Sequence, residues 1–328
     1  MKIEGGKFLL TGGASLIGSH ITEHLLEAGA REVVLFDNYS LGSPDTIQHL
    51  SQDSRVKLVR GDILRMNELY DALDGVNGVF AAAGFLTLPL SLNPTLGLSV
   101  NVMGQLNVFE ACRYRGVSKV VFSSSVAVYS DPLVEVIDET EPFAWNKLQP
   151  GGALYGASKI IGENIGRLYH DKHGVKSISL RYSSVYGERQ HYRAVNALYI
   201  IETYDRIVRG ERPIIPDDGS EVHDYIHAAD IARASLMAME SDVSRESFNV
   251  ATGVSTSLNR LVEIVQEVMG SNLQPEYKTP VGKIRATSSS TLKFSNKKIE
   301  TMLGWRPEIS IEEGIRRVIA WRKAQDGP

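Results

Sequence analysis

Residues 8–18 read FLLTGGASLIG, an apolar run that passes directly into a glycine-rich loop and then into the start of a helix. Glycines here permit a tight turn and close packing of helix on strand, and amides at the helix N-terminus can bind a pyrophosphate. Asp37 ends the next apolar run, where a carboxylate accepts hydrogen bonds from ribose hydroxyls and repels a 2′-phosphate. The loop and Asp37 therefore predict a site for NAD rather than NADP. The alternative is a glycine-rich turn beside a solvated carboxylate.

This loop begins a longer alternation of short apolar runs with segments of helix length. The runs are typical of buried strands and comprise Phe8–Leu10, Val33–Phe36, Val56–Val59, Val79–Ala82, Val120–Phe122 and Ile178–Leu180. Helices are expected between them, notably at Ser19–Ala28, Leu96–Arg115 and Tyr155–His173. Because parallel strands need crossover connections, the alternation predicts an α/β fold with a Rossmann-type, doubly wound parallel sheet. Ligands of such sheets bind beyond the carboxyl ends of the strands.

The alternation loosens after about Gly187. Further helices are expected at residues 195–208, 230–240, 258–269 and 312–323, with a short extended segment at 213–216. We therefore expect an NAD-binding Rossmann domain over residues 1–187 and a smaller C-terminal α/β lobe over 188–328 that contacts substrate. No internal repeat or low-complexity linker separates the halves, so some of the later chain is expected to return to the sheet.

Composition excludes several classes of protein. The 328 residues carry a formal net charge of −4, with 43% hydrophobic and 23% charged residues, which gives no electrostatic case for nucleic acid or an anionic membrane as partner. The single cysteine, Cys112, can form no internal disulfide and is expected as a small apolar residue in a helix. The sequence shows no signal peptide and no apolar stretch long enough to span a bilayer, so we expect a cytoplasmic protein.

Motifs along nearly the whole chain carry a resemblance to a known family. In chain order they are the glycine-rich loop, Asp37-Asn38, Gly61-Asp62-Ile63, Ala82-Ala83-Gly84, Asn101-Val102-Met103-Gly104, Ser123-Ser124-Ser125, Tyr155-Gly156-Ala157-Ser158-Lys159, Arg181-Tyr182, Val185-Tyr186-Gly187, Asp224-Tyr225-Ile226-His227, Phe248-Asn249-Val250, Gly282-Lys283-Ile284-Arg285 and Leu303-Gly304-Trp305. The chain resembles the extended short-chain dehydrogenases/reductases, in particular the NAD-dependent epimerase/dehydratase family typified by UDP-galactose 4-epimerase.

The resemblance implies where the cofactor binds. The NAD site is expected at Gly12, Ser15, Leu16, Ile17, Gly18, Asp37, Asn38, Asp62, Ile63, Ala82, Ala83, Asn101, Ser123, Tyr155, Lys159, Tyr182 and Val185. In this family Asp62 and Ile63 would flank the adenine, and Asn101 would help to order the active-site helix. Ser15 departs from the family pattern, which has glycine there, and its Cβ would lie where the pyrophosphate approaches.

Tyr155 and Lys159 are the expected catalytic pair. Their i, i+4 spacing places both side chains on one face of a helix, where the ammonium can lower the pKa of the phenol. Such a phenol can take a proton from a sugar hydroxyl, or return one, while a hydride moves to or from nicotinamide. By resemblance, Ser125 would hydrogen-bond the same substrate oxygen. On spacing alone, Tyr155 and Lys159 would be two ordinary residues on one face of a helix.

Other positions bear on the reaction and the substrate. Dehydratases of the family carry an acidic pair, and decarboxylases a glutamate, where this chain has Val126 and Ala127, so dehydration and decarboxylation are disfavoured. Arg285 matches an arginine that grips a nucleotide diphosphate, although it could also be a surface residue. Ser184 replaces the asparagine, and His223 the arginine, that assist it in the family. Leu86 stands where some 4-epimerases have lysine.

The leading hypothesis is a nucleotide-diphosphate-sugar epimerase, acting at carbon 4 of a UDP-hexose through a transient keto intermediate with NAD. Ser125, Ser184, His223 and Arg285 would contact the substrate. The losses at residues 184 and 223 motivate an alternative, a dehydrogenase of a smaller or non-nucleotide alcohol. A non-catalytic dinucleotide-binding module is the third hypothesis.

One further pattern concerns metal binding. The stretch His20-Ile21-Thr22-Glu23-His24 matches a zinc-peptidase pattern, but it lies behind the dinucleotide loop and no third ligand is indicated, so no metal is expected.

The resemblance also implies a homodimer in which helices 96–115 and 155–173 of two copies form a four-helix bundle. Apolar residues such as Val102, Leu106, Phe109, Ile161 and Ile165 fit either that interface or packing on the sheet.

Overall fold

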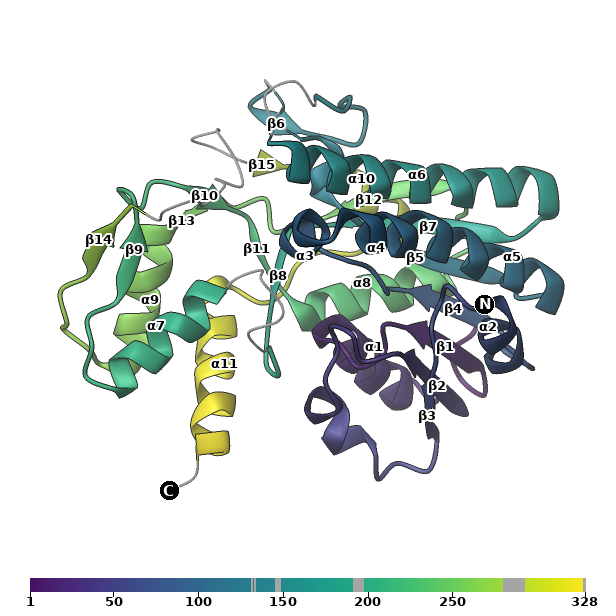
Figure 1. Cartoon of the computed structure of the whole chain (residues 1–328), viewed down its shortest axis with the longest axis horizontal. Helices are drawn as coiled ribbons and strands as arrows, with labels where there is room; N and C mark the ends of the chain where they lie inside the picture. The colour runs from purple at the N-terminus through teal and green to yellow at the C-terminus, as the bar shows by residue number, and fades with distance from the viewer. Residues whose placement is uncertain (131, 133, 145–148, 191–197, 280–292, 327–328) are drawn as a thin grey trace.

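A seven-stranded, fully parallel sheet forms the centre of the computed structural model, which describes residues 1–130, 132, 134–144, 149–190, 198–279 and 293–326 (Figure 1). Across the sheet the strands run β3 (Val56–Arg60), β2 (Glu32–Asp37), β1 (Lys7–Thr11), β4 (Gly78–Ala81), β5 (Lys119–Ser125), β7 (Lys176–Tyr182) and β12 (Glu246–Val250). The order reverses between β1 and β4, which is the switch point where open α/β sheets bind ligands. The predicted Rossmann-type fold is confirmed.

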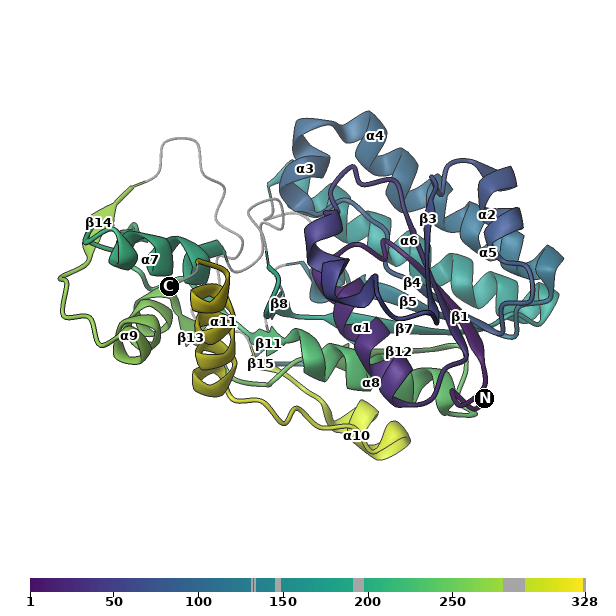
Figure 2. The same ribbon diagram turned by 90° about the horizontal axis from the view of Figure 1, so that it is seen from below.

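Helices cover both faces of this sheet (Figures 1 and 2). Helices α1 (Leu16–Glu27) and α8 (Ala228–Glu240) pack side by side on one face, and their apolar residues form one buried core with β1 and β7. On the other face lie α2 (Met66–Ala72), α5 (Gln105–Arg115) and α6 (Pro150–His173), which form a second core. Cys112 lies in α5 and is fully buried, and burial raises the pKa of its thiol.

Two predicted elements differ from the structure. Strand β3 was expected to be buried, but it lies at the sheet edge with β2 as its neighbour, and the Leu58 side chain is 46% exposed. The helix expected at residues 96–115 is divided into α4 (Pro94–Leu98), a π-helical segment (Ser99–Gly104) and α5. In the π segment the buried Asn101 side chain bonds both the amide and the carbonyl of Phe85, a long-range contact that helical periodicity cannot reveal.

The later half of the chain forms a smaller lobe beside the sheet, at the left of Figure 1. Its core is made by α7 (Leu198–Val208), α9 (Leu258–Met269), α11 (Ile311–Asp326) and the strand β9 (Ile214–Pro216). The chain also returns to the main sheet between these elements, because β12 pairs with β7. Trp305 is fully buried, and its indole N–H donates to the Asp230 carbonyl at 3.1 Å, which holds the segment before α11 against α8.

The remaining elements are short. They are η1 (Pro44–Leu50), α3 (Thr87–Leu92), η3 (Val126–Val128), β6 (Val136–Ile137), β8 (Ser184–Tyr186), β10 (Val222–His223), β11 (Tyr225–His227), β13 (Thr256–Ser257), β14 (Glu276–Lys278), β15 (Lys293–Phe294) and α10 (Lys297–Leu303). Pairs β8–β11, β10–β13, β9–β14 and β6–β15 form two-stranded sheets. The β9–β14 pair belongs to the lobe, whereas β8 follows β7 of the main sheet and pairs with β11.

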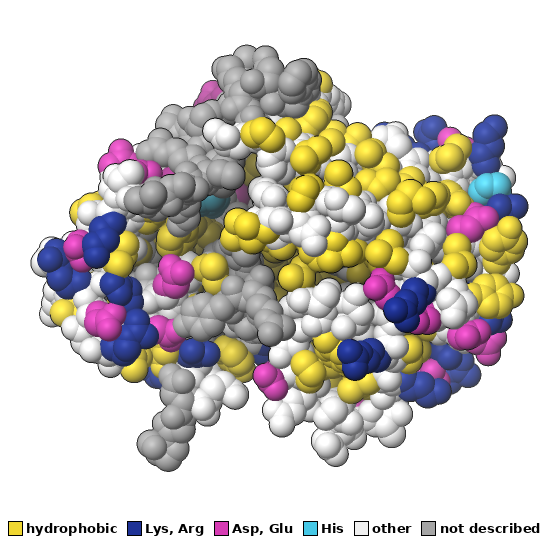
Figure 3. All heavy atoms as spheres, viewed as in Figure 1, with side chains coloured by type: hydrophobic (Ala, Val, Ile, Leu, Met, Phe, Trp, Pro, Cys, Tyr) yellow, Lys and Arg dark blue, Asp and Glu magenta, His cyan; other side chains and the backbone are white. Residues whose placement is uncertain are grey.

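One face of the molecule is markedly apolar. Figure 3 shows hydrophobic side chains gathered over α3 to α6, and the exposed members of these elements include Leu92, Met103, Leu154, Ile161 and Leu168. A shallow depression on this face is lined by residues of both the π segment and α6. Within the part of the chain that the structure describes, no helix is both long and apolar enough to cross a membrane.

Candidate active site

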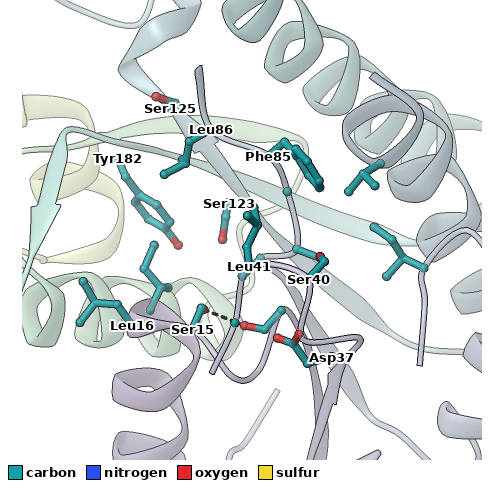
Figure 4. Close-up of a pocket in the computed structure, with 18 of the residues that line it drawn as sticks. Ser15, Leu16, Asp37, Ser40, Leu41, Phe85, Leu86, Ser123, Ser125 and Tyr182 are labelled. Atoms are coloured by element: carbon teal, nitrogen blue, oxygen red, sulfur yellow. Dashed lines mark hydrogen bonds between the residues drawn. The ribbon is translucent and has the colours of Figure 1, made fainter. Parts of the chain in front are cut away.

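A pocket lies at the carboxyl edge of the sheet, where β1, β2, β4, β5 and β7 end (Figure 4). Most of the predicted cofactor and catalytic residues line it: Gly12, Ser15, Leu16, Ile17, Asp37, Asn38, Asp62, Ile63, Ala82, Ala83, Ser123, Ser125, Tyr155, Lys159, Tyr182 and Val185. Gly18 and Asn101 support the pocket from behind. The strand order therefore brings together residues that are up to 173 positions apart, between Gly12 and Val185.

Close packing explains the glycines of the loop. Gly12 has a φ of +70°, and a Cβ on it would lie 2.9 Å from the backbone of Ala83. A Cβ on Gly18 would lie 2.5 Å from the Gly13 carbonyl oxygen, so helix α1 could not approach the loop. Gly12 requires a left-handed backbone, and Gly18 requires the space that a side chain would fill. Only glycine meets both requirements.

Ser15 departs from the expected glycine without strain. Its backbone is extended, with φ −109° and ψ 169°, and it is the N-cap of α1. The hydroxyl donates to the Gly12 carbonyl at 2.7 Å and accepts the Gly18 N–H at 3.1 Å. The side chain thus stabilises the helix start. The first-turn amides of Leu16 and Ile17, whose residues line the pocket, have no carbonyl partner within the helix and can meet an anion.

Asp37 is held by two backbone amides at the end of β2. Its carboxylate accepts the N–H of Ala14 at 3.0 Å and that of Tyr39 at 2.7 Å, and the residue is 8% exposed. Burial raises the pKa of Asp37, and the two hydrogen bonds oppose that rise. Asn38 continues this acidic end of the pocket by donating to Asp62 at 3.2 Å. The arrangement suits ribose hydroxyls and disfavours an added phosphate.

The opposite end of the pocket holds Ser125, Tyr155 and Lys159. Burial raises the pKa of the Tyr155 phenol to about 12, while a hydrogen bond with Ser125 opposes the shift. Burial lowers the pKa of Lys159 to about 8, and the charge of Glu163 opposes that shift. The ammonium donates to the Ser123 carbonyl at 2.8 Å and lies 5.7 Å from the Tyr155 ring centroid. Burial therefore raises the pKa of Tyr155 in this structure, and the lowering that was expected from the Lys159 ammonium is not seen.

Asn101 lies just behind this end of the pocket. Its amide nitrogen donates to the Phe85 carbonyl at 2.9 Å and to the Ser158 hydroxyl at 3.1 Å, and its oxygen accepts the Phe85 N–H at 2.7 Å. Ser158 stands between Tyr155 and Lys159 on α6. Asn101 therefore ties α6 to the segment after β4.

Of the predicted substrate contacts, Ser125 lines the pocket, whereas Ser184 and His223 do not. Ser184 lies in β8, where its amide donates to the Asp224 carbonyl at 2.8 Å, and it does not line the pocket although Ser183 and Val185 do. His223 also lies outside the lining, with its Nε2 2.9 Å from a carboxylate oxygen of Glu221. Arg285 lies outside the residues that the structure describes.

Another cation near this part of the chain, Arg189, does not replace the expected arginine at position 223. Arg189 pairs with Glu23 at 2.7 Å and donates to the Ser19 hydroxyl at 3.2 Å, so it is engaged by α1 rather than by the pocket. Arg193, like Arg285, falls outside the described residues.

Sequence reasoning missed several residues that line the pocket. Figure 4 shows Ser40, Leu41 and Phe85 at the cavity, and Gly42, Val100 and Ser183 also line it. Ser40 to Gly42 follow β2, and Phe85 follows β4. The rule that ligands bind beyond the carboxyl ends of strands could have found both groups. Leu86, which stands at the position where a lysine was looked for, contributes an apolar side chain to the pocket lining.

The zinc-peptidase pattern on α1 forms a buried polar cluster. His20 is 4% exposed, and its ring lies between the carboxylate of Glu188, at 3.7 Å, and the ring of His227. Burial, aided by the charge of Arg189, lowers the pKa of His20 to about 3. Among the described residues no three His, Cys, Asp or Glu side chains are grouped so that they could hold a metal ion.

Comparisons with known proteins agree with this geometry. The model of the NAD dependent epimerase/dehydratase family matches residues 8–251. A Methanocaldococcus jannaschii protein with the provisional name UDP-glucose 4-epimerase is 35% identical over 319 residues, which cover 96% of this chain and 98% of that one.

Two solved structures have a similar fold. UDP-glucose 4-epimerase of Thermotoga maritima with UDP-glucose has a TM-score of 0.85 and 29% identity, and the match covers 97% of this chain and 99% of that one. UDP-glucose 4-epimerase of Thermus thermophilus in complex with NAD has a TM-score of 0.81 and 29% identity over the same shares of the two chains.

Proposed function

The chain belongs to the NAD-dependent epimerase/dehydratase family, and from that premise we propose that it is an NAD-dependent epimerase that inverts carbon 4 of the hexose in a UDP-hexose. The observation that carries the proposal is the pocket, in which Ser125, Tyr155 and Lys159 face a dinucleotide-binding loop. UDP-glucose 4-epimerases at 29% identity share the fold over nearly the full chain, which supports this reaction.

The residues present fit NAD. The close approach of Gly12 to Ala83 leaves a cradle that a Cβ would fill, and the first-turn amides of α1 can hold the pyrophosphate. Asp37 would accept the adenosine ribose hydroxyls, with Asp62 and Ile63 beside the adenine. Tyr182 and Val185 line the other end of the pocket, toward the catalytic residues. NAD bound there would supply reversible hydride transfer at the sugar carbon, which allows the hydrogen to return on the opposite face.

Tyr155 moves the proton that accompanies the hydride. In its phenolate form Tyr155 takes the proton of the C4 hydroxyl as the keto sugar forms, and the resulting phenol gives that proton back when the carbonyl is reduced. Ser125 hydrogen-bonds the same sugar oxygen and keeps it within reach of the phenol. The Lys159 ammonium stabilises the phenolate as it develops. Val126 and Ala127 carry no acidic group, so no water is removed beside the keto group.

The substrate would lie between the sheet and the lobe. We assign residues 1–187 mainly to the cofactor and catalysis and residues 188–328 mainly to the substrate. Arg285 is proposed to grip the diphosphate, since Arg189 is engaged elsewhere and His223 faces Glu221. Ser184 is proposed to contact the substrate from the face of β8 on which its side chain lies.

The apolar face over the π segment, α5 and α6 supports a homodimer in which these helices form a four-helix bundle (Figure 3). Met103 and Leu168 are more than half exposed on this face, with Leu154 and Ile161 exposed between them, and a second copy would bury all four.

The cytoplasm is the proposed compartment, because the single Cys112 can form no internal disulfide.

The experiment incubates the purified protein with UDP-galactose and catalytic NAD, then measures UDP-glucose by chromatography and NADH by absorbance. We expect the epimer to accumulate without stoichiometric NADH. The alternative, a dehydrogenase of a non-nucleotide alcohol, is motivated by the positions of Ser184 and His223 outside the pocket, but the named relatives do not favour it. NADH formed in step with oxidation of a simple alcohol, with no epimer from any UDP-hexose, would overturn the proposal.

A further inference from the structure

A buried carboxylate lies directly behind the proposed catalytic residues. Glu163 follows Lys159 by one turn on α6 and is 3% exposed. One of its oxygens accepts the Ser124 hydroxyl at 2.6 Å and the Arg181 Nε at 2.9 Å, while the other accepts Arg181 Nη2 at 2.8 Å and the Ser247 hydroxyl at 2.9 Å. Four donors thus converge on one buried group, from β5, β7 and β12.

These contacts join α6 to the strand that carries Ser125. Lys159 donates to the carbonyl of Ser123, and Glu163 accepts from the side chain of the next residue, Ser124. Two successive residues of β5 are therefore fixed to two successive turns of α6, immediately before the strand ends at Ser125. The distance between Ser125 and the Tyr155 phenol depends on this attachment.

Glu163 also supplies negative charge to the end of the pocket that holds Lys159. Near Lys159 the titratable groups are Tyr155 and Glu163 on its own helix and Tyr182, which lines the same pocket. Glu163 in turn faces Arg181 of β7 at 2.8 Å and Arg167 of α6 at 4.0 Å. The described groups from β5 and the π segment are serines and Asn101, which are neutral. Burial lowers the pKa of Lys159, and the Glu163 charge opposes it.

Glu163 remains ionised in this position. Burial alone would raise the pKa of Glu163, but the hydrogen bonds and charge of Arg181, with the Ser124 and Ser247 hydroxyls, outweigh burial and hold it below the usual value. The pair formed with Arg181 is stable in the fold because both partners are also hydrogen-bonded elsewhere, Arg181 to the Tyr129 hydroxyl at 2.8 Å.

We propose that Glu163 is a positioning residue for the reaction: it fixes β5 to α6 beside Ser125 and provides the counter-charge of the Lys159 ammonium. The proposal rests on the proposed function for the role of Lys159. Glu163 touches neither substrate nor cofactor and acts through the groups that do.

The test compares Glu163→Gln with wild type in kcat from pH 6 to pH 10. Glutamine keeps the size and loses the charge, so the alkaline decline of kcat is expected to move to lower pH by roughly one unit, as for loss of a nearby opposite charge. Glu163→Asp keeps the charge and should restore the wild-type position of the decline at reduced kcat. Ser247→Ala removes one donor from the carboxylate without changing charge, and should leave the decline in place.

A second measurement does not depend on turnover. Competitive acetylation of Lys159 at increasing pH, read by peptide mass spectrometry, reports when the amine loses its proton. In Glu163→Gln this is expected at lower pH than in wild type. If wild type makes no epimer, the proposed function fails while this measurement still decides the role of Glu163. If Glu163→Gln does not fold, the double variant Glu163→Leu/Arg181→Met replaces the buried pair by apolar groups and is measured instead. Coincident acetylation curves for wild type and variant would overturn the proposal.

Discussion

Replacing Lys159 by methionine should stabilise the protein while it stops turnover. The ammonium is held in a buried site, where its pKa falls from the ordinary 10.5 to about 8. That difference corresponds to about 3 kcal/mol by which the fold disfavours the charged lysine. Methionine has a similar length and no charge, but it gives up the hydrogen bond to the Ser123 carbonyl, which is worth about 1 kcal/mol. The expected gain in the free energy of unfolding is therefore about 2 kcal/mol at pH 7.

The gain has a defined dependence on pH. Below pH 8 both the folded and the unfolded lysine are protonated, so the destabilisation is present in full. Between pH 8 and 10.5 the folded lysine has lost its proton and the unfolded one has not, so wild type recovers stability as pH rises. Above pH 10.5 the charge contributes nothing, and the advantage of Lys159→Met should be gone.

Thermal unfolding followed by calorimetry measures this. For 328 residues the entropy of unfolding is about 0.7 kcal/mol per kelvin, so the expected rise in Tm at pH 7 is about 3 °C. Lys119→Met is a matched control, because burial also lowers the pKa of Lys119 to about 8, and its ammonium donates to the Ser241 carbonyl far from the pocket. It should raise Tm in the same pH range and retain activity. A Lys159→Met variant that melts at or below the wild-type temperature at pH 7 would refute the reasoning.

Three further changes test other parts of the structure. Tyr155→Phe should lower kcat by about 10²- to 10⁴-fold, since the proton carrier is lost, while a thermal-shift assay still detects NAD; unchanged kcat would exclude the phenol as the acid and base. Asp37→Asn places an NH₂ group against one of two backbone amides, those of Ala14 and Tyr39, so the Kd for NAD by calorimetry should rise roughly tenfold and discrimination against NADP should shrink. Trp305→Ala should lower Tm by about 4–7 °C through loss of about 3–5 kcal/mol, with kcat at 25 °C unchanged; a wild-type Tm would contradict the packing described for α8 and α11.

The parts of the fold that follow local rules were predictable from sequence. Strands β1, β2, β4 and β5 contain runs of apolar residues buried on both faces, and the loop after β1 carries glycines that its geometry requires. The family and its fold were predicted from motifs in a fixed order and are confirmed. The assignment of individual site residues remains a prediction, although the structure gathers most of them around one pocket.

The remainder depends on long-range pairing. Side chains alternate along a strand, so the presence of Ser183 and Val185 in the lining places Ser184 on the other face. The pairing of β8 with β11 sets that register, and no local pattern encodes it. His223 likewise lies in β10, which pairs with β13 more than thirty residues later, at Thr256. Strand β3 is exposed because it lies at the edge of the sheet. Its edge position depends on the strand order of the whole sheet, which no local pattern encodes.

The seventh strand of the main sheet has a consequence for synthesis on the ribosome. Strand β12 is made of residues 246–250, so every other strand of the sheet has left the ribosome before it. Until then β7 presents unpaired backbone groups, with Ile178 and Leu180 beside them, and such an edge invites pairing with other chains. A nascent chain that stalls between residues 182 and 246 would carry a nearly finished but open sheet. Shortened forms that end near residue 187 would keep that edge permanently, which makes them prone to aggregation whatever their affinity for a dinucleotide.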